Sequence, residues 1–330
     1  MALIGKARRN DRQYINPVPT SVGGLSTMFK VLPRYLMERG EREPKHPLGP
    51  FLTDPRIYET PPATDLRVTW MGHSTMLLEI DGVRVLIDPV WEQRAAPVEW
   101  FGPKRFFAPP LPLESLPSIH VVLFSHDHYD HLGARTVRRL ANAPATAQAQ
   151  WITPLGVGKI LNQLGVKKVS ELDWTQSLEA GPLEVTALPA RHFSGRSLSN
   201  RFETLWASFV FAGPKHRVYY GADSGEWAGS SEIGKSYGPF NLTMLEIGAF
   251  DPLWADIHMG PDGAVRTFRA LGATGLMMPI HWGLFNLALH AWREPIERVF
   301  AIDGLPLWSP EPGRPTEVNG VEVRSTWWRR

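Results

Sequence analysis

Residues 125–133 read Ser125-His126-Asp127-His128-Tyr129-Asp130-His131-Leu132-Gly133 and follow directly on the apolar run Val121–Phe124. With 11 His in 330 residues, a chance match to His-x-His-x-Asp-His is rare, on the order of 5 in 10,000. A loop that leaves a buried strand can direct His126 and His128 toward one ion and turn Asp130 and His131 toward a second. Imidazoles suit zinc, and a carboxylate lowers the net charge of the site while leaving a position for water. The pattern therefore predicts a metal centre; the alternative is a solvated charged loop.

Further ligands are expected at the ends of later strands, because a two-metal site needs about six or seven donors. Three polar residues end apolar runs in the second half of the chain: His192 after Leu183–Leu188, Asp223 after Val218–Tyr220 and His281 after Gly275–Pro279. Loops at strand ends commonly carry functional residues. Taken singly, each of the three is more often a structural residue. Given the motif at residues 126–131, we interpret them as metal ligands.

Short β-type runs dominate the chain from Leu66 onward, with helical segments interspersed among them. Asp81-Gly82 joins two of these runs and is a strong hairpin signal. This order of elements favours two packed sheets covered by helices. The expected strands are Arg67–Trp70, Thr75–Ile80, Val83–Ile87, Val121–Phe124, Val169–Leu172, Leu183–Leu188, Ala207–Phe211, Val218–Tyr220, Leu242–Ile247 and Gly275–Pro279; the expected helices are Ala134–Leu140, Gly156–Leu164 and Pro261–Leu271.

The first 62 residues are rich in Pro, Gly and charge. They predict an N-terminal extension over residues 1–62 that packs on a main domain over residues 63–330. Inside the extension, one helix face is expected, in which Pro33 either distorts the helix or marks its first turn. This helix either packs on the main domain or touches a membrane. Its apolar positions are Met28, Val31, Leu32, Tyr35 and Leu36.

The composition excludes several functional classes. Thirty-five basic residues against 33 acidic ones give a formal net charge of +2, so charge does not support nucleic-acid binding. The chain contains no Cys, which excludes disulfides, thiolate metal sites and a Cys nucleophile. It has neither an 18-residue apolar run nor the pattern of a signal or transit peptide, and this predicts a cytoplasmic protein.

The motif, taken with His192, Asp223 and His281, resembles the metallo-β-lactamase superfamily. That resemblance implies an α/β (α+β) fold, the αββα sandwich of two mixed β-sheets flanked by helices. Shorter segments resemble, more narrowly, the N-acylphosphatidylethanolamine-hydrolysing phospholipase D family, over about residues 14–300. They are Asn16-Pro17-Val18-Pro19-Thr20, Trp70-Met71-Gly72-His73-Ser74-Thr75, Gly102-Pro103-Lys104-Arg105-Phe106, Glu171-Leu172-Asp173-Trp174, Glu232-Ile233-Gly234-Lys235, Gly238-Pro239-Phe240 and Ile280-His281-Trp282-Gly283.

The resemblance implies a cofactor of two Zn²⁺ ions, and other divalent metals suit the same donors. The implied reaction is cleavage of N-acylphosphatidylethanolamine, or of a related lipid phosphodiester, by a hydroxide that bridges the metals. The alternative is a hydrolase of lactones, β-lactams or other small carbonyl substrates, since the same hydroxide can attack a carbonyl. Carried over by position, the first zinc is held by His126, His128 and His192, the second by Asp130, His131 and His281, and Asp223 bridges the two.

Asp130, Asp223 and His258 are the candidate catalytic residues. His258 lies in a loop with polar flanks, where it either contacts the leaving group or substrate or is a surface histidine. His73 either orients a metal ligand or is a packed histidine. Asp88 follows the run Val83–Ile87 and either bonds a ligand histidine or caps a turn.

The chain is rich in aromatic residues, with 13 Trp and 15 Phe. Those near the expected site either line an apolar groove for an acyl chain or fill the core. Lys104 and Arg105 either meet a lipid phosphate or cap the surface. The expected partners are a small-molecule or phospholipid substrate and the inner face of a membrane, without nucleic acid; a homodimer is implied by the resemblance alone. The aromatic and apolar residues concerned are Trp91, Trp100, Phe101, Phe106, Phe107, Trp282, Phe285 and Leu289.

Overall fold

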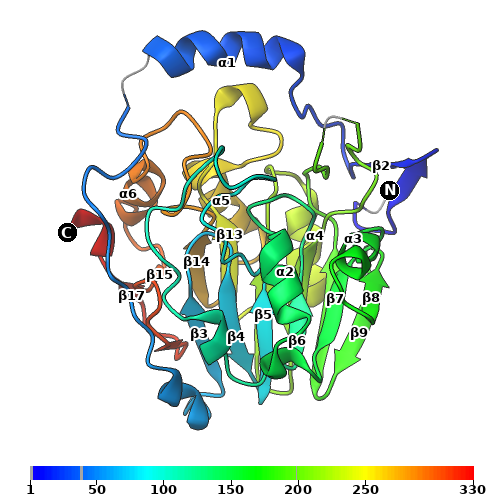
Figure 1. Ribbon diagram of the computed structural model, residues 1–330, viewed down its shortest axis with the longest axis vertical. Helices are drawn as coiled ribbons and strands as arrows, with labels where there is room; N and C mark the ends of the chain where they lie inside the picture. Colours follow the sequence, from blue (N-terminus) through cyan, green and yellow to red (C-terminus); the bar gives the residue numbers. More distant parts are fainter. Residues whose placement is uncertain (1–2, 38–39, 198) are drawn as a thin grey trace.

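The computed structural model describes residues 3–37, 40–197 and 199–330, and two β-sheets packed face to face form its centre. One sheet has seven strands and the other has six. Each combines parallel and antiparallel pairs. Helices lie outside the sheets (Figure 1). The predicted sandwich of two mixed sheets flanked by helices is confirmed.

The seven-stranded sheet has the order β16-β3-β4-β5-β6-β7-β8. Its first half is antiparallel, and Asp81-Gly82 makes the tight turn between β4 and β5 as the sequence predicts. From β5 to β8 the strands are parallel. The strands are β3 (Leu66–Trp70), β4 (Met76–Ile80), β5 (Val83–Ile87), β6 (Val121–Leu123), β7 (Gln150–Pro154), β8 (Val169–Leu172) and β16 (Thr316–Glu317).

The six-stranded sheet has the order β14-β13-β12-β11-β10-β9. Strands β12, β13 and β14 are parallel to one another. Strand β11 is antiparallel to both β10 and β12, so β10 runs in the same direction as β12. The carboxyl ends of four strands therefore reach the same edge of this sheet. The strands are β9 (Ser177–Ala180), β10 (Leu183–Leu188), β11 (Ser208–Ala212), β12 (Arg217–Tyr220), β13 (Leu242–Glu246) and β14 (Leu276–Ile280).

Two small two-stranded sheets and six helices complete the described part of the chain. The small sheets pair β1 (Arg8–Asn10) with β2 (Gln13–Ile15) and β15 (Trp308–Ser309) with β17 (Val323–Arg324). None of the helices in the described residues combines the length and apolarity that crossing a bilayer requires. The helices are α1 (Leu25–Met37), α2 (Ala134–Leu140), α3 (Gly158–Gln163), α4 (Gly229–Tyr237), α5 (Gly260–Ala270) and α6 (Glu294–Phe300).

Strand β4 shows how the sandwich divides its apolar side chains between two cores. Met76 and Leu78 belong to the core between the sheets, whereas Leu77 belongs to a second core that includes Val137 and Leu140 of α2. Alternation arises because successive side chains of a strand point to opposite faces. Both faces of this strand are buried, and its one charged residue, Glu79, is paired with Arg67.

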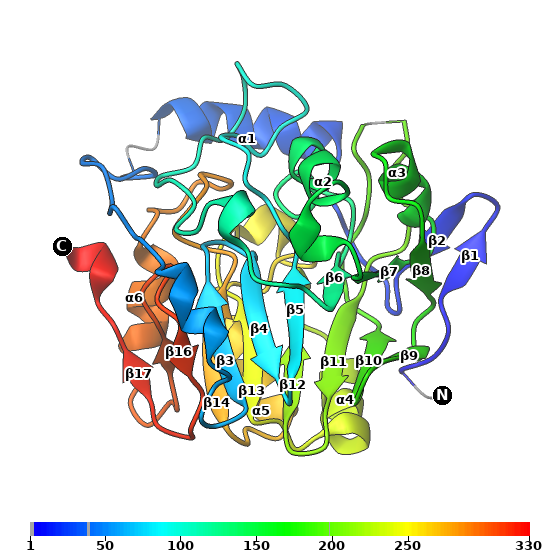
Figure 2. The same ribbon diagram turned by 60° about the horizontal axis from the view of Figure 1, so that its bottom comes forward.

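Helix α1 lies across the upper edge of the molecule, apart from the two sheets, in both views (Figures 1 and 2). Pro33 is inside the helix rather than in its first turn. Leu32 and Tyr35 of the predicted apolar face are exposed, and Val31 is half-buried. The side chains of Met28 and Leu36 lie outside the described residues. The helix is tied to the body by an ion pair of 2.9 Å between Arg34 and Asp251.

Candidate metal centre

The predicted ligands meet at the edge where strands of both sheets end. Strand β6 delivers the loop that begins at Ser125, and β10, β12 and β14 deliver His192, Asp223 and His281. Because these strands share one direction within each sheet, their carboxyl ends lie together. This edge lies below α1 in Figure 1. Every ligand expected from the sequence is brought into one cluster.

Three histidine nitrogens form the first group of donors. His126 Nε2 lies 2.9 Å from His128 Nδ1, and His192 Nε2 lies 3.3 Å from the same nitrogen. One oxygen of Asp223 is within 3.8 Å of His126 and 3.7 Å of His192. Potential ligand atoms of these four residues all lie within 4.8 Å of one another. A single cation placed among them has four donors.

The second group contains Asp130, His131 and His281. Asp130 Oδ2 lies 3.6 Å from His131 Nε2 and 3.2 Å from His281 Nε2. Asp223 contacts this group as well, through Oδ1 at 3.2 Å from His131 Nε2 and Oδ2 at 3.0 Å from His281 Nε2. The Asp223 carboxylate thus lies between the two groups, which is the position of a bridging ligand.

Burial and charge fit this donor set to metal ions. His131 Nε2 and Asp223 Oδ1 are buried atoms for which no hydrogen-bond partner is found among the described residues. Burial holds the pKa of His126 and of His192 well below the ordinary value, so both imidazoles are neutral and can donate a lone pair. For His281, burial lowers the pKa but Asp223 and Asp130 outweigh it and raise the pKa to about 10. Asp130 and Asp223 therefore favour positive charge beside His281, and divalent cations would supply it.

Asp88 hydrogen-bonds to His131 on the side of the ring that faces away from the other ligands. Its Oδ2 accepts a 2.7 Å hydrogen bond from His131 Nδ1 and another from the hydroxyl of Tyr220, and its Oδ1 accepts from the backbone N–H of Ser125. A hydrogen bond to one ring nitrogen of a ligand histidine leaves the other nitrogen to face the metal. Asp88 therefore bonds a predicted ligand histidine, which is the first of the two roles expected from the sequence.

His73 lies in direct contact with the second group of ligands. Its Nε2 is 2.9 Å from Asp130 Oδ2, and its ring centroid is 3.9 Å from that of His281. His73 groups with Asp130, His131 and His281 as a set of potential metal ligands. Burial lowers its pKa to about 3, so the ring is neutral. Both the orienting role and direct ligation are compatible with this geometry.

His258 is half-buried next to the cluster rather than on the outer surface. Its ring lies 5.1 Å from His192 and 5.3 Å from His281, measured between centroids. Its Nδ1 donates a 2.6 Å hydrogen bond to Glu246 Oε2, whose carboxylate is fully buried and also accepts from the backbone N–H of Ser224. Sequence reasoning missed Glu246, although a polar residue at the end of the apolar strand β13 is the same signal that identified His281.

The predicted aromatic cluster divides into buried and exposed parts. Phe107, Trp282, Phe285 and Leu289 are buried, and Trp91 and Phe106 are half-buried. Trp100 and Phe101 are exposed, and with Val31 and Tyr35 of α1 they line a cavity of about 600 Å³. The other lining residues are Glu43, Arg94, Gly102, Pro103, Lys104, Trp254, Asn286, Leu287, Ala288 and Leu289.

Arg105 corrects a prediction, because it neither caps the surface nor faces a lipid phosphate. It is buried and donates hydrogen bonds of 2.9 Å to the carbonyls of Glu92 and Val90. Burial lowers its pKa to about 10. Lys104, its neighbour, is exposed. Only Lys104 remains available to a lipid phosphate.

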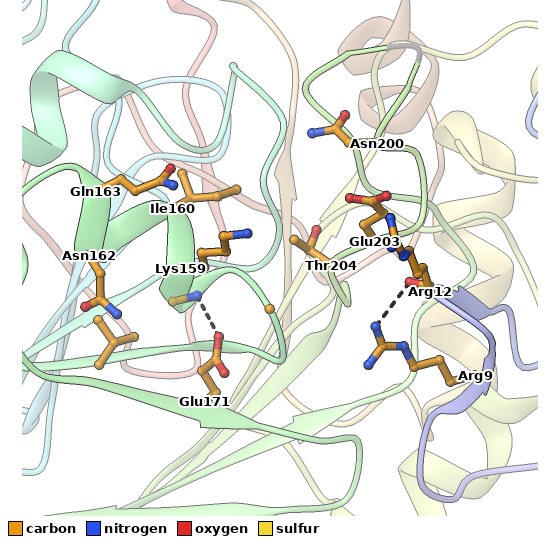
Figure 3. Close-up of a pocket in the computed structure, with 13 residues that line it drawn as sticks. Arg9, Arg12, Lys159, Ile160, Asn162, Gln163, Glu171, Asn200, Glu203 and Thr204 are labelled. Carbon is orange, nitrogen blue, oxygen red and sulfur yellow. Dashed lines mark hydrogen bonds between the residues drawn. The ribbon is translucent and has the colours of Figure 1, made fainter.

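A second cavity, of about 1080 Å³, shares no residue with the metal cluster (Figure 3). It lies between α3, β8, the β1–β2 hairpin and the loop that carries Asn200 and Thr204. Its charged residues include Arg9, Lys159 and Glu171. The carboxylate of Glu171 accepts the backbone N–H of Gly158 at 2.7 Å. Groups of both signs line this cavity, and none of the groups of potential metal ligands found among the described residues belongs to it.

Comparison with known proteins agrees with the geometry. Residues 83–282, which include all seven ligands predicted from the sequence, match the family model of the Beta-lactamase superfamily domain. An uncharacterised protein of Mycobacterium tuberculosis is 46% identical over 86% of this chain and 77% of its own length. The N-acyl-phosphatidylethanolamine-hydrolyzing phospholipase D 1 of Caenorhabditis elegans is 34% identical over 86% of this chain and 84% of its own length.

Solved structures with the same fold include two hydrolases of distant sequence. An isothiocyanate hydrolase from Delia radicum gut bacteria superposes with a TM-score of 0.62 at 19% identity, covering 76% of this chain and 99% of its own. A metallo hydrolase of Ignicoccus hospitalis gives a TM-score of 0.58 at 21% identity, covering 76% and 97%. At such identities the similarity concerns the fold alone.

Proposed function

This chain is a metallo-hydrolase of the metallo-β-lactamase superfamily and is related within it to N-acylphosphatidylethanolamine-hydrolysing phospholipase D; from this premise we propose that it is a zinc-dependent phosphodiesterase. The proposed substrate is N-acylphosphatidylethanolamine or a related lipid phosphodiester. The products are then phosphatidic acid and an N-acylethanolamine.

The carboxylate of Asp223, lying between two groups of histidines, is the observation that carries the proposal. It is 3.7 Å from His192 on one side and 3.0 Å from His281 on the other. Two divalent cations held there would lower the pKa of a bound water and neutralise the oxygens of a phosphodiester. His126, His128 and His192 would hold one ion, and Asp130, His131 and His281 the other, with Asp223 between them.

His258 is the proposed partner of the leaving group. Glu246 accepts from His258 Nδ1 at 2.6 Å and so fixes the orientation of the ring. Its Nε2 is then free to face a substrate oxygen and to pass it a proton, which a departing alkoxide requires. Glu246 is buried and His258 is half-buried at the edge of the cluster, so the ring is oriented from the inside while a substrate can reach it from the outside.

The exposed apolar side chains near the site support a membrane-bound substrate. Phe29, Leu32 and Met37 of α1 are 78%, 60% and 79% exposed, and Trp100 and Phe101 are 80% and 69% exposed. Helix α1 contains no acidic residue, and of its two cations Arg34 is paired with Asp251 while Lys30 is exposed. Apolar side chains interspersed with cations suit the interface of an anionic bilayer. We name these five apolar residues the apolar face.

Turnover of N-acylphosphatidylethanolamine in detergent micelles tests the proposal. Zinc-loaded protein is expected to release N-acylethanolamine, and the chelated protein is expected to release none. Lactone and β-lactam substrates are assayed in parallel. Hydrolysis of these carbonyl substrates without cleavage of any phosphodiester would contradict the proposal and favour the alternative reaction predicted from the sequence. A cytoplasmic location and a homodimer stay predictions.

A further inference from the structure

The segment Asn16-Pro17-Val18-Pro19-Thr20 lies far from the metal ligands in sequence but next to one of them in space. Asn16 follows β2 and is buried. Its side chain contacts His192, which is 176 residues away and fully buried. The proposed function assigns no role to this segment. Its position is next to the backbone of a proposed metal ligand.

We propose that Asn16 is a positioning residue for the ligand His192 and that the N-terminal segment of residues 16–21 completes the metal centre. Asn16 Nδ2 donates a 2.7 Å hydrogen bond to the carbonyl of His192, and the N–H of His192 donates a 3.0 Å hydrogen bond to Asn16 Oδ1. One side chain thus satisfies both backbone groups of the ligand. This inference rests on the proposed metal centre.

The chemistry of the pair selects an amide. The two backbone groups of His192 require one donor and one acceptor from a single planar group, which Asn provides. Asp has the same shape but would set a carboxylate oxygen against the His192 carbonyl. Ala would leave two buried backbone groups of a metal ligand without partners, which is costly.

Asn16 contacts only the backbone of His192 among the hydrogen bonds described above, and a different residue, Ile257, orients its ring. Its Nδ1 donates a 3.0 Å hydrogen bond to the carbonyl of Ile257, which leaves Nε2 facing the first group of ligands. Asn16 therefore holds the backbone of His192, and Ile257 holds its ring. Ile257 precedes His258, so the loop that orients the ligand ring also carries the proposed proton donor.

The N-terminal segment also holds this second loop. The backbone N–H of Ser21 donates a 2.9 Å hydrogen bond to Asp256, and Asp256 pairs with Arg191 at 2.7 Å. Arg191 in turn donates to the carbonyl of Pro19 at 2.9 Å and to the hydroxyl of Thr20 at 3.2 Å. Residues 16–21 thereby join the loop of His192 to the loop of His258.

Metal binding by the full-length Asn16→Ala and Asn16→Asp variants tests the inference. Zn²⁺ affinity is measured by competition with a chromophoric chelator, and the visible spectrum is recorded after Co²⁺ substitution. We expect one of the two metals to bind roughly 10–100-fold more weakly, as is usual when the support of a ligand is removed. The second metal keeps its affinity, and only one part of the Co²⁺ spectrum changes.

Gln13→Ala is the matched control. Gln13 lies in β2 and its amide donates a 3.1 Å hydrogen bond to the carbonyl of Arg201, so the substitution also removes a link between the N-terminal segment and the body. This link does not reach a metal ligand. We expect both metals to bind the control variant as they bind the wild type.

Three outcomes would overturn the inference. Wild-type affinity and spectrum in both Asn16 variants would show that Asn16 does not position His192. Equal weakening of both metals, shared with Gln13→Ala, would show a general structural role. A wild-type protein that binds no metal would contradict the proposed metal centre itself, so failure of the proposed function is distinguishable from failure of the Asn16 inference.

Discussion

At the scale of single residues, the metal ligands could be predicted from the sequence, because metal coordination restricts the residue type at a position more strongly than packing does. His126, His128, Asp130 and His131 are close in sequence, and their spacing alone predicts a metal site. Glu246 and Asn16 are isolated polar residues whose partners lie 12 and 176 positions away. Glu246 ends an apolar strand, and Asn16 lies in one of the segments that carry the family resemblance, but neither signal names a contact, which the fold reveals.

Substitution of one ligand from each group tests the two-metal arrangement. We expect His192→Ala and Asp130→Ala each to lower activity by roughly 100-fold or more and to reduce the metal content, because each removes a donor from a different group. Metal content is measured by atomic absorption, and folding by circular dichroism. His46→Ala, at an exposed histidine, serves as the control. Full activity in either ligand variant would contradict the mechanism.

Glu246→Gln tests the role of His258. The amide keeps an acceptor for the backbone N–H of Ser224 but loses the charge that holds His258 Nδ1–H. We expect kcat to fall roughly 10²- to 10⁴-fold, the usual value of general acid–base catalysis, with KM and metal content nearly unchanged.

A double-variant cycle on Glu246 and His258 tests whether Glu246 acts by orienting the His258 ring or affects activity in another way. If Glu246 acts through His258, then His258→Ala lowers kcat to a similar extent and the double variant is no slower than the worse single variant. Glu226→Gln, at a carboxylate that pairs with Arg266 on the surface, is the control. Additive losses in the double variant would show that the two residues act independently.

At the scale of elements, strands with two buried faces were predictable and marginal elements were not. Strands β5 and β10 and helix α2 have the predicted bounds, because mostly apolar, buried runs or a helical period mark them. Strand β8 also has the predicted bounds, although it is an edge strand with one buried residue. Strand β9, Ser177–Ala180, is a largely exposed edge strand of the six-stranded sheet and has no such run.

Two helices and one buried strand were missed for a different reason. Helix α4 begins Gly-Ser-Ser, residues of low helix propensity, and α6 contains only seven residues. Strand β7 ends on Pro154. In each case tertiary packing, rather than local propensity, stabilises the element.

Asp81, in the β4–β5 turn of one sheet, contacts the β11–β12 turn of the other sheet. We expect this contact to contribute to stability. Its carboxylate accepts the backbone N–H groups of Lys215 and His216 at 2.9 and 3.0 Å and the ring N–H of His216 at 2.7 Å. We expect Asp81→Ala to lower the free energy of unfolding by about 1–3 kcal/mol at pH 7, since hydrogen bonds to a charged carboxylate are lost. Urea unfolding measures this difference.

The difference in the free energy of unfolding between the wild type and Asp81→Ala should depend on pH. Burial alone would raise the pKa of Asp81, but the hydrogen bonds from His216 and from the backbone hold it below the ordinary value of 3.8. A carboxyl with a depressed folded pKa stabilises the protein above its unfolded pKa and loses this contribution as the pH falls through the folded value. The gap between wild type and Asp81→Ala should therefore close in acid below about pH 4. A gap that widens in acid would contradict this assignment.

At the scale of the whole molecule, the metal cluster and the apolar face lie on the same side. The ligands occupy the edge below α1, and the long connection between β5 and β6, which contains Trp100 and Phe101, rises beside α1 (Figure 2). The exposed Leu52 and Val321 belong to neither segment. A lipid substrate drawn from a bilayer would approach the metals from this side.

Substitutions in the apolar face test that geometry. We expect Phe29→Glu and the double variant Trp100→Glu/Phe101→Glu to bind anionic phosphatidylglycerol vesicles at least tenfold more weakly than the wild type. The reason is that burying one large apolar side chain contributes about 1.5–3 kcal/mol. Sedimentation with vesicles measures binding, and turnover of a short-chain, water-soluble phosphodiester is expected to stay unchanged. Val321→Glu, at a 63% exposed residue, is the control.

The same variants distinguish a bilayer from a second copy of the chain as the occupant of the apolar face. A helix that leaves Phe29, Leu32 and Met37 exposed could equally be covered by its counterpart in a homodimer. Sedimentation velocity without lipid separates the two cases. If the wild type is a dimer that the Glu substitutions dissociate, and vesicle binding is absent, then the membrane prediction is wrong and the apolar face is a subunit interface. If vesicle binding falls while the oligomeric state is unchanged, the lipid surface is its partner, because only the bilayer contact has then been lost.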